Sequence, residues 1–126
     1  MALVKRFQVK ESLEQMDQTS EAILVEDQAV AELRLQLSMA KWGLEMEEAR
    51  IKLEAKGSNA DERKYGAVLA MGNDDKYGAS LATVNGFERD IAQREGSASR
   101  LRRQHQAQSL RIEGLIATVN YLGGKP

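Results

Sequence analysis

Side chains that could carry acid–base or metal chemistry are few in this chain of 126 residues. His105 is the only histidine, and there is no cysteine, which excludes a cysteine nucleophile and any thiolate metal site. A lone imidazole could still act as a general base or as one metal ligand. His105 falls on a heptad position of an expected helix, however, where a polar side chain commonly sets the register of a coiled coil. We therefore predict a seam residue here, and no catalytic residue, metal or cofactor.

Two acidic clusters could also suggest chemistry. The first, "NDDKYG" at 73–78, lacks the alternating acidic spacing and the distant glutamate of a calcium loop, so helix capping explains it better. The second contains Glu45, Glu47 and Glu48. Paired carboxylates act as acid and base only when a cleft removes them from water, whereas these lie on an expected solvent-facing helix. The sequence therefore predicts that the protein is not an enzyme.

Arginines gather in the last third of the chain. We call Arg94, Arg100, Arg102, Arg103 and Arg111 the arginine arc. Such a group could neutralise phosphates of a nucleic acid without sequence preference, chiefly through Arg100, Arg102, Arg103 and Arg111. The stretch has no interleaved aromatic residues for base stacking. Nucleic-acid binding is therefore the alternative function, and it is not favoured.

The charge distribution offers a simpler role for the arginine arc. Residues 9–56 carry six basic and 11 acidic side chains, whereas residues 89–111 carry six arginines against Asp90 and Glu95. Two such segments attract each other if they lie antiparallel. We therefore predict ion pairs from the arginine arc to Glu26, Asp27 and Glu32.

The elements that position these groups are long helices. In the first half an apolar residue recurs every seven positions, at Val9, Met16, Ile23, Val30, Leu37, Leu44 and Ile51. This spacing predicts a helix over 9–56 with one seam. The row three residues further on is polar in its first part, with Ser12, Thr19 and Glu26, so the seam is narrow there.

A further apolar row appears in the second part of this helix. The second stripe consists of Leu35, Met39, Trp42, Met46, Ala49 and Leu53. It is offset by two residues from the first row, which places it roughly 200° around the helix. Since one neighbouring helix cannot cover both faces, we predict self-association through the large side chains Leu35, Met39, Trp42, Met46 and Leu53. Packing against the chain's own short helix is the competing use of this row.

The last part of the chain has its own heptads. One row holds Tyr77, Val84, Ile91, Ala98, His105, Ile112 and Val119, and the next holds Ser80, Phe87, Arg94, Leu101, Gln108, Leu115 and Leu122. Their unbroken register predicts a helix over 74–122. Gly96, Ser97 and Ser99 make residues 96–99 the place where a kink would occur.

The connector is more than a plain turn. Gly57 suits the end of the first helix, and Ser58 or Asn59 suits the start of a short helix over 60–71 that ends at Gly72. Asn73 would cap the last helix. We expect the short helix to fold over the second stripe. At the start of the chain Leu3, Phe7 and Val9 stand on alternating positions around Lys5, which suits either a short extended arm over residues 1–8 or a frayed terminus.

The connector also carries a resemblance. The stretch "GSNADERKYGAVLAMGNDDKY" between two long charged helices resembles the connector of small α-helical hairpin proteins encoded by phages and prophages. In those proteins it similarly reads Asn-x-x-x-Arg-Lys, an alanine-rich turn, and an acidic residue or two before Tyr. Gly66, Gly72 and Gly78 depart from the alanine-rich form. The resemblance implies a phage or mobile-element setting and assigns no mechanism.

Together these patterns predict an all-α single domain over 1–126. It is a long antiparallel helical hairpin, coiled-coil-like, with a short third helix in the connector. We expect a non-enzymatic structural or interaction protein that forms a homodimer or a larger assembly, as a phage or mobile-element component or adaptor. No stretch approaches 18 apolar residues, so we expect no membrane association. The expected location is the cytoplasm, or the virion or host cytoplasm for a phage protein.

Overall fold

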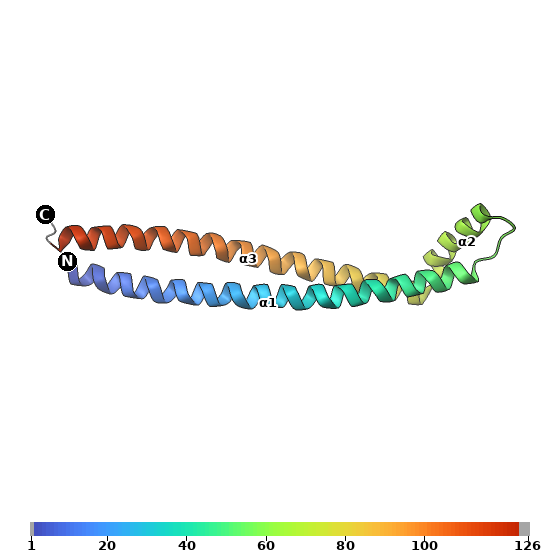
Figure 1. Ribbon diagram of the computed structural model, residues 1–126, viewed down its shortest axis with the longest axis horizontal. Coiled ribbons are helices and arrows are strands. Elements are labelled where there is room, and N and C mark those ends of the chain that lie inside the picture. Colours follow the sequence, from blue (N-terminus) through green and yellow to red (C-terminus); the bar gives the residue numbers. More distant parts are fainter. Residues whose placement is uncertain (1, 124–126) are drawn as a thin grey trace. The chain divides into compact units, whose positions relative to one another are not determined.

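The fold is a helical hairpin, as the sequence predicts. The computed structural model describes residues 2–123, in three helices: α1 (Ala2–Glu54), α2 (Ala60–Asn73) and α3 (Asp75–Leu122). Within the described residues there is no strand. The long helices α1 and α3 run antiparallel against each other, and α2 lies in the connector between them (Figure 1). The all-α hairpin is therefore confirmed.

The hairpin divides into two compact units. Residues 2–29 and 94–123 form one, which we call the terminal unit, and Val30–Gln93 form the other, the connector unit. The terminal unit pairs the first part of α1 with the last part of α3. The connector unit contains the rest of α1 and α3 together with α2. Each is described by itself below.

Burial follows the heptad rows in both units. In the connector unit the buried core residues are Val30, Ile51, Ala67, Val84 and Ile91. Four of these belong to the predicted heptad rows, and Ala67 comes from α2. In the terminal unit the buried residues are Ser12, Thr19, Ala98 and Ile112, all on the same rows. The seven-residue period thus sets the contact face of each long helix.

The helix limits differ from those expected at the ends. Residues 2–8 are helical and belong to α1, so the structure has neither an extended arm nor a frayed end over this range. Residue 1 lies outside the described residues. The other end of α1 is Glu54, two residues short of the expected position 56. Helix α3 remains helical through 96–99, because glycine and serine weaken a helix but do not remove its backbone donors.

The start of α2 is held by reciprocal caps. Asn59 has extended backbone geometry, and its side chain accepts a hydrogen bond from the Glu62 backbone N at 2.9 Å. Glu62 Oε2 in turn accepts from the backbone N and the hydroxyl of Ser58, at 2.9 and 2.6 Å. The predicted cap at Ser58 or Asn59 is confirmed for Asn59. Because each side chain satisfies a backbone donor near the helix start, the pair fixes where α2 begins.

The turn between α1 and α2 depends on Gly57. A Cβ at this position would lie 2.8 Å from the Arg63 backbone N and 2.9 Å from the Glu62 Cβ. The connector therefore returns so closely over the first turn of α2 that only glycine fits without a backbone shift.

The junction of α2 and α3 differs from the prediction. Helix α2 continues past Gly72 to Asn73, and the single residue Asp74 separates it from α3. The Asp74 side chain, and not Asn73, caps α3 by accepting from the Tyr77 backbone N at 2.8 Å. Asn73 instead donates from its amide to the Leu69 carbonyl at 3.2 Å, within its own helix. The prediction of an Asn73 cap is wrong, because the negatively charged Asp74 carboxylate, one residue closer to α3, occupies the capping position.

Candidate interaction surface

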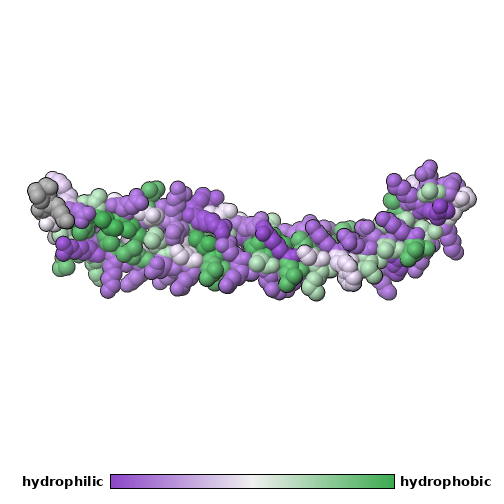
Figure 2. All heavy atoms as spheres, viewed as in Figure 1, coloured by the Kyte–Doolittle hydropathy of each residue, from purple (hydrophilic) through white to green (hydrophobic). Residues whose placement is uncertain are grey.

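The second stripe lies exposed on α1 within the connector unit. Its large side chains have exposed fractions between 54% and 87%, for Leu35, Met39, Trp42, Met46 and Leu53. Figure 2 shows hydrophobic side chains reaching the surface in separate patches among hydrophilic ones. Single exposed apolar residues are ordinary, but five at helical spacing along one face of α1 leave a row of apolar surface in contact with water.

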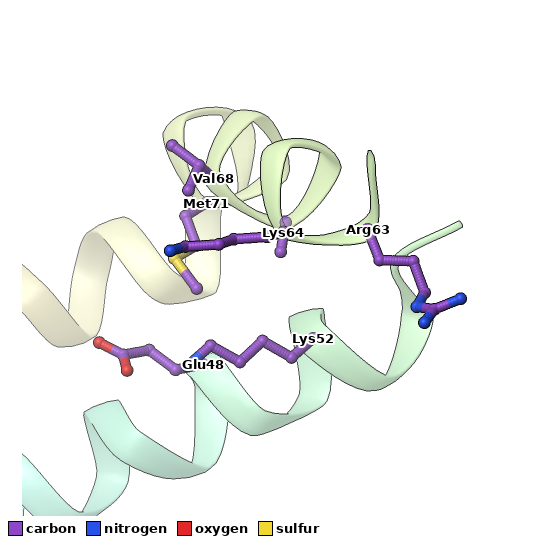
Figure 3. A pocket seen from close by; sticks show the side chains of 7 residues that line it. Glu48, Lys52, Arg63, Lys64, Val68 and Met71 are labelled. Carbon is purple, nitrogen blue, oxygen red and sulfur yellow. The ribbon is translucent and has the colours of Figure 1, made fainter. Parts of the chain in front are cut away.

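The exposure of this row corrects one expectation. We predicted that α2 folds over the second stripe, and the structure places α2 elsewhere. Helix α2 faces a different side of α1, the one that carries Glu48 and Lys52 (Figure 3). Because only Asp74 separates α2 from α3, the connection is too short to carry α2 around to the far face of α1.

A cleft of about 420 Å³ lies between α1 and α2. Its apolar part comes from Ala67, Val68 and Met71, and its charged part from Glu48, Lys52, Arg63 and Lys64. In Figure 3 the Lys64 and Met71 side chains reach toward Glu48 and Lys52, while Arg63 points away from them. Arg63 donates to the Gly57 carbonyl at 3.4 Å.

Sequence reasoning did not identify this cleft. The available signal was "ERKYGAVLAM", where a basic pair precedes an apolar run at helical spacing. That pattern shows an amphipathic helix and does not show which face of α1 it meets.

The arginine arc is partly used in ion pairs within the terminal unit. Arg94 Nη1 donates to Glu26 Oε1 at 3.1 Å, and Arg102 Nη2 donates to both carboxylate oxygens of Asp27 at 2.7 Å. The predicted pairing is therefore confirmed for Glu26 and Asp27. It is wrong for Glu32, which accepts from Gln36 on its own helix at 3.2 Å.

The rest of the arginine arc faces solvent. Arg100 donates to the Ser97 hydroxyl at 3.1 Å, one turn earlier on α3. Arg103 and Arg111 are exposed. Of the four arginines of the alternative nucleic-acid site, Arg102 forms an interhelical ion pair, and the other three are exposed on α3.

Polar side chains fill much of the seam in the terminal unit. Thr19 is buried and donates its hydroxyl to the Gln15 carbonyl at 3.1 Å, and His105 is half-buried on its heptad row. Glu26 Oε2 and Gln108 Oε1 are buried without a hydrogen-bond partner. A hollow of about 270 Å³ lies beside Thr19 and Gln108. The seam of this unit therefore contains polar groups whose hydrogen bonding is incomplete within the chain.

The carboxylates that might have formed an acid–base pair serve structure. Glu47 Oε2 accepts from the Arg50 guanidinium at 2.8 Å, and Glu54 Oε2 accepts from it at 3.4 Å. Glu45 is exposed. Across the described part of the chain, no group of three histidine, cysteine, aspartate or glutamate side chains is placed to hold a metal ion.

Arg50 and Asp74 form the most connected polar group. Both oxygens of Asp74 accept from Arg50 Nη2 at 2.9 Å. The hydrogen bond from the Tyr77 backbone N, followed by that from Arg50, lowers the pKa of Asp74 below its ordinary value of 3.8. The hydrogen bond to Asp74, followed by that to Glu47, raises the pKa of Arg50 above its ordinary value. Both members of the pair are therefore ionised at neutral pH.

Comparison with known protein families, with curated proteins and with solved structures finds no match to this chain. Between residues 2 and 123, no helix has the length and apolar character needed to cross a membrane. The fold and the surfaces described above are therefore the basis for any functional inference.

Proposed function

We propose that this protein is a non-enzymatic α-helical structural or adaptor protein that self-associates through the second stripe. The observation that carries the proposal is the exposure, on one face of α1, of Leu35, Met39, Trp42, Met46 and Leu53. Together with Ala49 they are spaced alternately by four and three residues, which is the spacing of a coiled-coil seam. The chain buries one such seam internally and leaves this one to a partner.

The physical chemistry of the row supports this role. Removing apolar surface from water is favourable by roughly 25 cal/mol per Å², and tryptophan and methionine are enriched at the centres of protein interfaces. Trp42 lies at the middle of the row with Met39 and Met46 on either side. The partner is a second copy of the chain, in a homodimer or a larger assembly.

The proposed setting rests on the connector. Its resemblance to phage and prophage hairpin proteins favours a phage or mobile-element component, located in the cytoplasm or in the virion. A non-enzymatic role is supported by the position of His105 in the hairpin seam and by the pairing of Glu47 with Arg50.

The first test is the solution mass, measured by light scattering after gel filtration at two concentrations. We expect a dimer or larger species that persists on dilution. The variant Met39→Glu with Met46→Glu is expected to be monomeric, because it places charge in the seam. Leu110→Glu is the matched control, since Leu110 is equally exposed but lies on α3 in the terminal unit. A wild-type monomer at every concentration would refute self-association.

Nucleic-acid binding is the rival function, favoured by the exposure of Arg103 and Arg111. We expect no measurable binding of duplex DNA at low salt, because Glu26 and Asp27 neutralise Arg94 and Arg102. Fluorescence anisotropy with labelled DNA checks this. Binding that weakens steeply with salt, and that Arg102→Glu with Arg103→Glu abolishes, would support the rival.

A further inference from the structure

The second stripe is symmetric about its own centre. Leu35 and Leu53 each lie nine residues from Leu44, and Trp42 and Met46 each lie two residues from it. Met39 and Ala49 are likewise each five residues away. A row with this symmetry can pair with a reversed copy of itself and leave no member unmatched.

We propose that the second stripe pairs with the second stripe of another copy in an antiparallel arrangement, about a two-fold axis near residue 44. Trp42 then meets the partner's Met46, Met39 meets the partner's Ala49, and Leu35 meets the partner's Leu53. A two-fold interface requires that each such contact occur twice, with the roles exchanged. This inference rests on the proposed self-association and specifies its geometry.

The paired side chains suit each other in kind and size. A methionine sulfur beside an aromatic ring makes a favourable contact, and this register places Met46 of the partner against Trp42. The long Met39 lies against the short Ala49 of the partner, so large and small side chains alternate along the seam. In the parallel arrangement Trp42 would face the partner's Trp42 and Ala49 the partner's Ala49, which leaves a crowded layer beside an empty one.

Charge at the two ends favours the same orientation. Glu32 and Lys56 flank the second stripe, each 12 residues from Leu44, and both are exposed. Lys56 lies two residues beyond Glu54, the last residue of α1, so the antiparallel register brings Glu32 near the partner's Lys56 at each end, just past the helical part of the seam. The parallel register would instead place glutamate opposite glutamate and lysine opposite lysine, which is unfavourable.

The flanks of the seam also fit. Gly43 comes next to its own copy at the axis, and a Cβ there would meet nothing within 4 Å in the monomer. Two glycines at one point allow the two helix backbones to approach closely. On the other flank Glu45 meets the partner's Glu45, one like-charge contact in water. The parallel alternative would pair Glu45 with the partner's Arg50, but Arg50 is already held by Asp74 and Glu47.

Cysteine crosslinking of the full chain distinguishes the orientations, because the chain has no cysteine of its own. The variants are Leu35→Cys and Leu53→Cys, at positions that are 59% and 87% exposed in the single chain. Under mild oxidation we expect an equimolar mixture to give on the order of tenfold more covalent dimer than either variant alone, because a disulfide requires Cα atoms within about 7 Å. Leu110→Cys mixed with either variant is the control and should give only background.

Each outcome bears on a separate claim. Crosslinking of each single variant with itself would show a parallel dimer, which overturns the antiparallel inference and leaves self-association intact. A dimeric mass without crosslinking in any combination would show that another surface forms the dimer, which also overturns the inference. A monomeric mass would remove the proposed function itself.

A charge exchange gives an independent measurement of the same register. Glu32→Lys alone is expected to weaken the dimer about twofold or more, since exposed pairs contribute modestly, and adding Lys56→Glu is expected to restore it. Sedimentation velocity over a concentration series reports the dissociation constant. In a parallel dimer neither change would matter, because like charges face each other before and after each substitution.

Discussion

The Arg50 guanidinium and the Asp74 carboxylate, 24 positions apart in the sequence, are joined by two hydrogen bonds of 2.9 Å. Asp74 also accepts from the Tyr77 backbone N, and its own backbone N donates to the Met71 carbonyl at 3.4 Å. One residue therefore ends α2, begins α3 and ties both to α1. This contact therefore holds the junction of α2 and α3 against α1.

Substitution of Asp74 is expected to lower the melting temperature in a graded way. Asp74→Asn keeps a side-chain oxygen that can cap α3 but loses the charge that Arg50 holds, whereas Asp74→Ala loses both. We expect the order wild type, Asp74→Asn, Asp74→Ala in thermal melts followed by circular dichroism. Asp75→Asn is the matched control, since Asp75 is exposed and caps nothing. Equal melting temperatures for Asp74→Ala and Asp75→Asn would contradict this account.

Stability is expected to fall in acid because of two carboxylates. The pKa of Asp74 lies below its ordinary 3.8, and hydrogen bonds from the Ser58 hydroxyl and backbone N lower the pKa of Glu62 below its ordinary 4.5. In this range the unfolded chain binds more protons than the folded one, so stability rises with pH. The stabilisation from these two carboxylates is fully present at pH values above their ordinary pKa values. It is lost as the pH falls through the lowered pKa values of the folded state.

Urea unfolding at a series of pH values between about 7 and 2 measures this effect. The double variant Asp74→Asn with Glu62→Gln should show a flatter dependence of the unfolding free energy on pH than the wild type. The control double variant Asp75→Asn with Asp61→Asn removes the same number of charges, each at the position next to Asp74 or Glu62. Its unfolding free energy should keep the wild-type dependence on pH. If both double variants flatten the curve equally, general charge repulsion is responsible and not these two hydrogen-bonded groups.

Much of the fold could be predicted from the sequence because it depends on local period. The heptad rows through Val30 and Ile51, and through Val84 and Ile112, are the rows that the structure buries. Opposite net charge likewise indicated ion pairs from the arginine arc to Glu26 and Asp27, but not that Arg94 and Arg102 are the arginines that form them. Both the buried heptad rows and the interhelical ion pairs can be predicted once the two long helices are taken to pair antiparallel.

The position of α2 could not be predicted in this way. Its sequence shows an apolar face, but two different faces of α1 were available to receive it. Two features that no periodicity marks accompany the observed position: the one-residue connection from α2 to α3 and the contact between Arg50 and Asp74. The cleft beside Ala67 could not be predicted for the same reason, because it forms where α2 meets α1.

Ile51 and Leu53 provide a direct comparison of the two faces of α1. Ile51 is 3% exposed and Leu53 is 87% exposed, two positions apart. Ile51→Ala is expected to lower the free energy of unfolding by about 2–5 kcal/mol, since it leaves a cavity in the core. Leu53→Ala should change it by less than about 0.5 kcal/mol at concentrations where the chain is monomeric.

Urea titrations at low and high protein concentration separate the two effects. Leu53→Ala should lose stability relative to the wild type only at high concentration, where its contact with a second copy forms. Ile51→Ala should be destabilised at both concentrations by the same amount. A concentration-independent loss for Leu53→Ala would show that this side chain packs within its own chain.

The ion pair of Glu26 and Arg94 is expected to be less stabilising than apolar packing at the same positions. Both residues occupy heptad rows of the terminal unit, and the Glu26 side chain is only 18% exposed. Its Oε1 accepts from Arg94, while its Oε2 is buried without a partner. Replacing a buried ion pair by apolar residues commonly stabilises a protein by about 1–4 kcal/mol, and because only the Glu26 side is largely desolvated while Arg94 is 50% exposed, we expect a gain at the low end of this range. Glu26→Leu with Arg94→Leu should therefore raise the melting temperature.

The single variant Arg94→Leu should have the opposite effect, because it leaves the Glu26 carboxylate unpaired in the seam. Asp27 and Arg102 provide the matched control pair in the same unit. Their side chains are 47% and 55% exposed, so replacing both with leucine removes a pair of small net value and buries little new surface. If the two double variants change the melting temperature equally, helix propensity explains the gain. A larger gain for the Glu26 and Arg94 pair would show that the seam carries an uncompensated charge, which keeps the terminal unit less stable than its heptads allow.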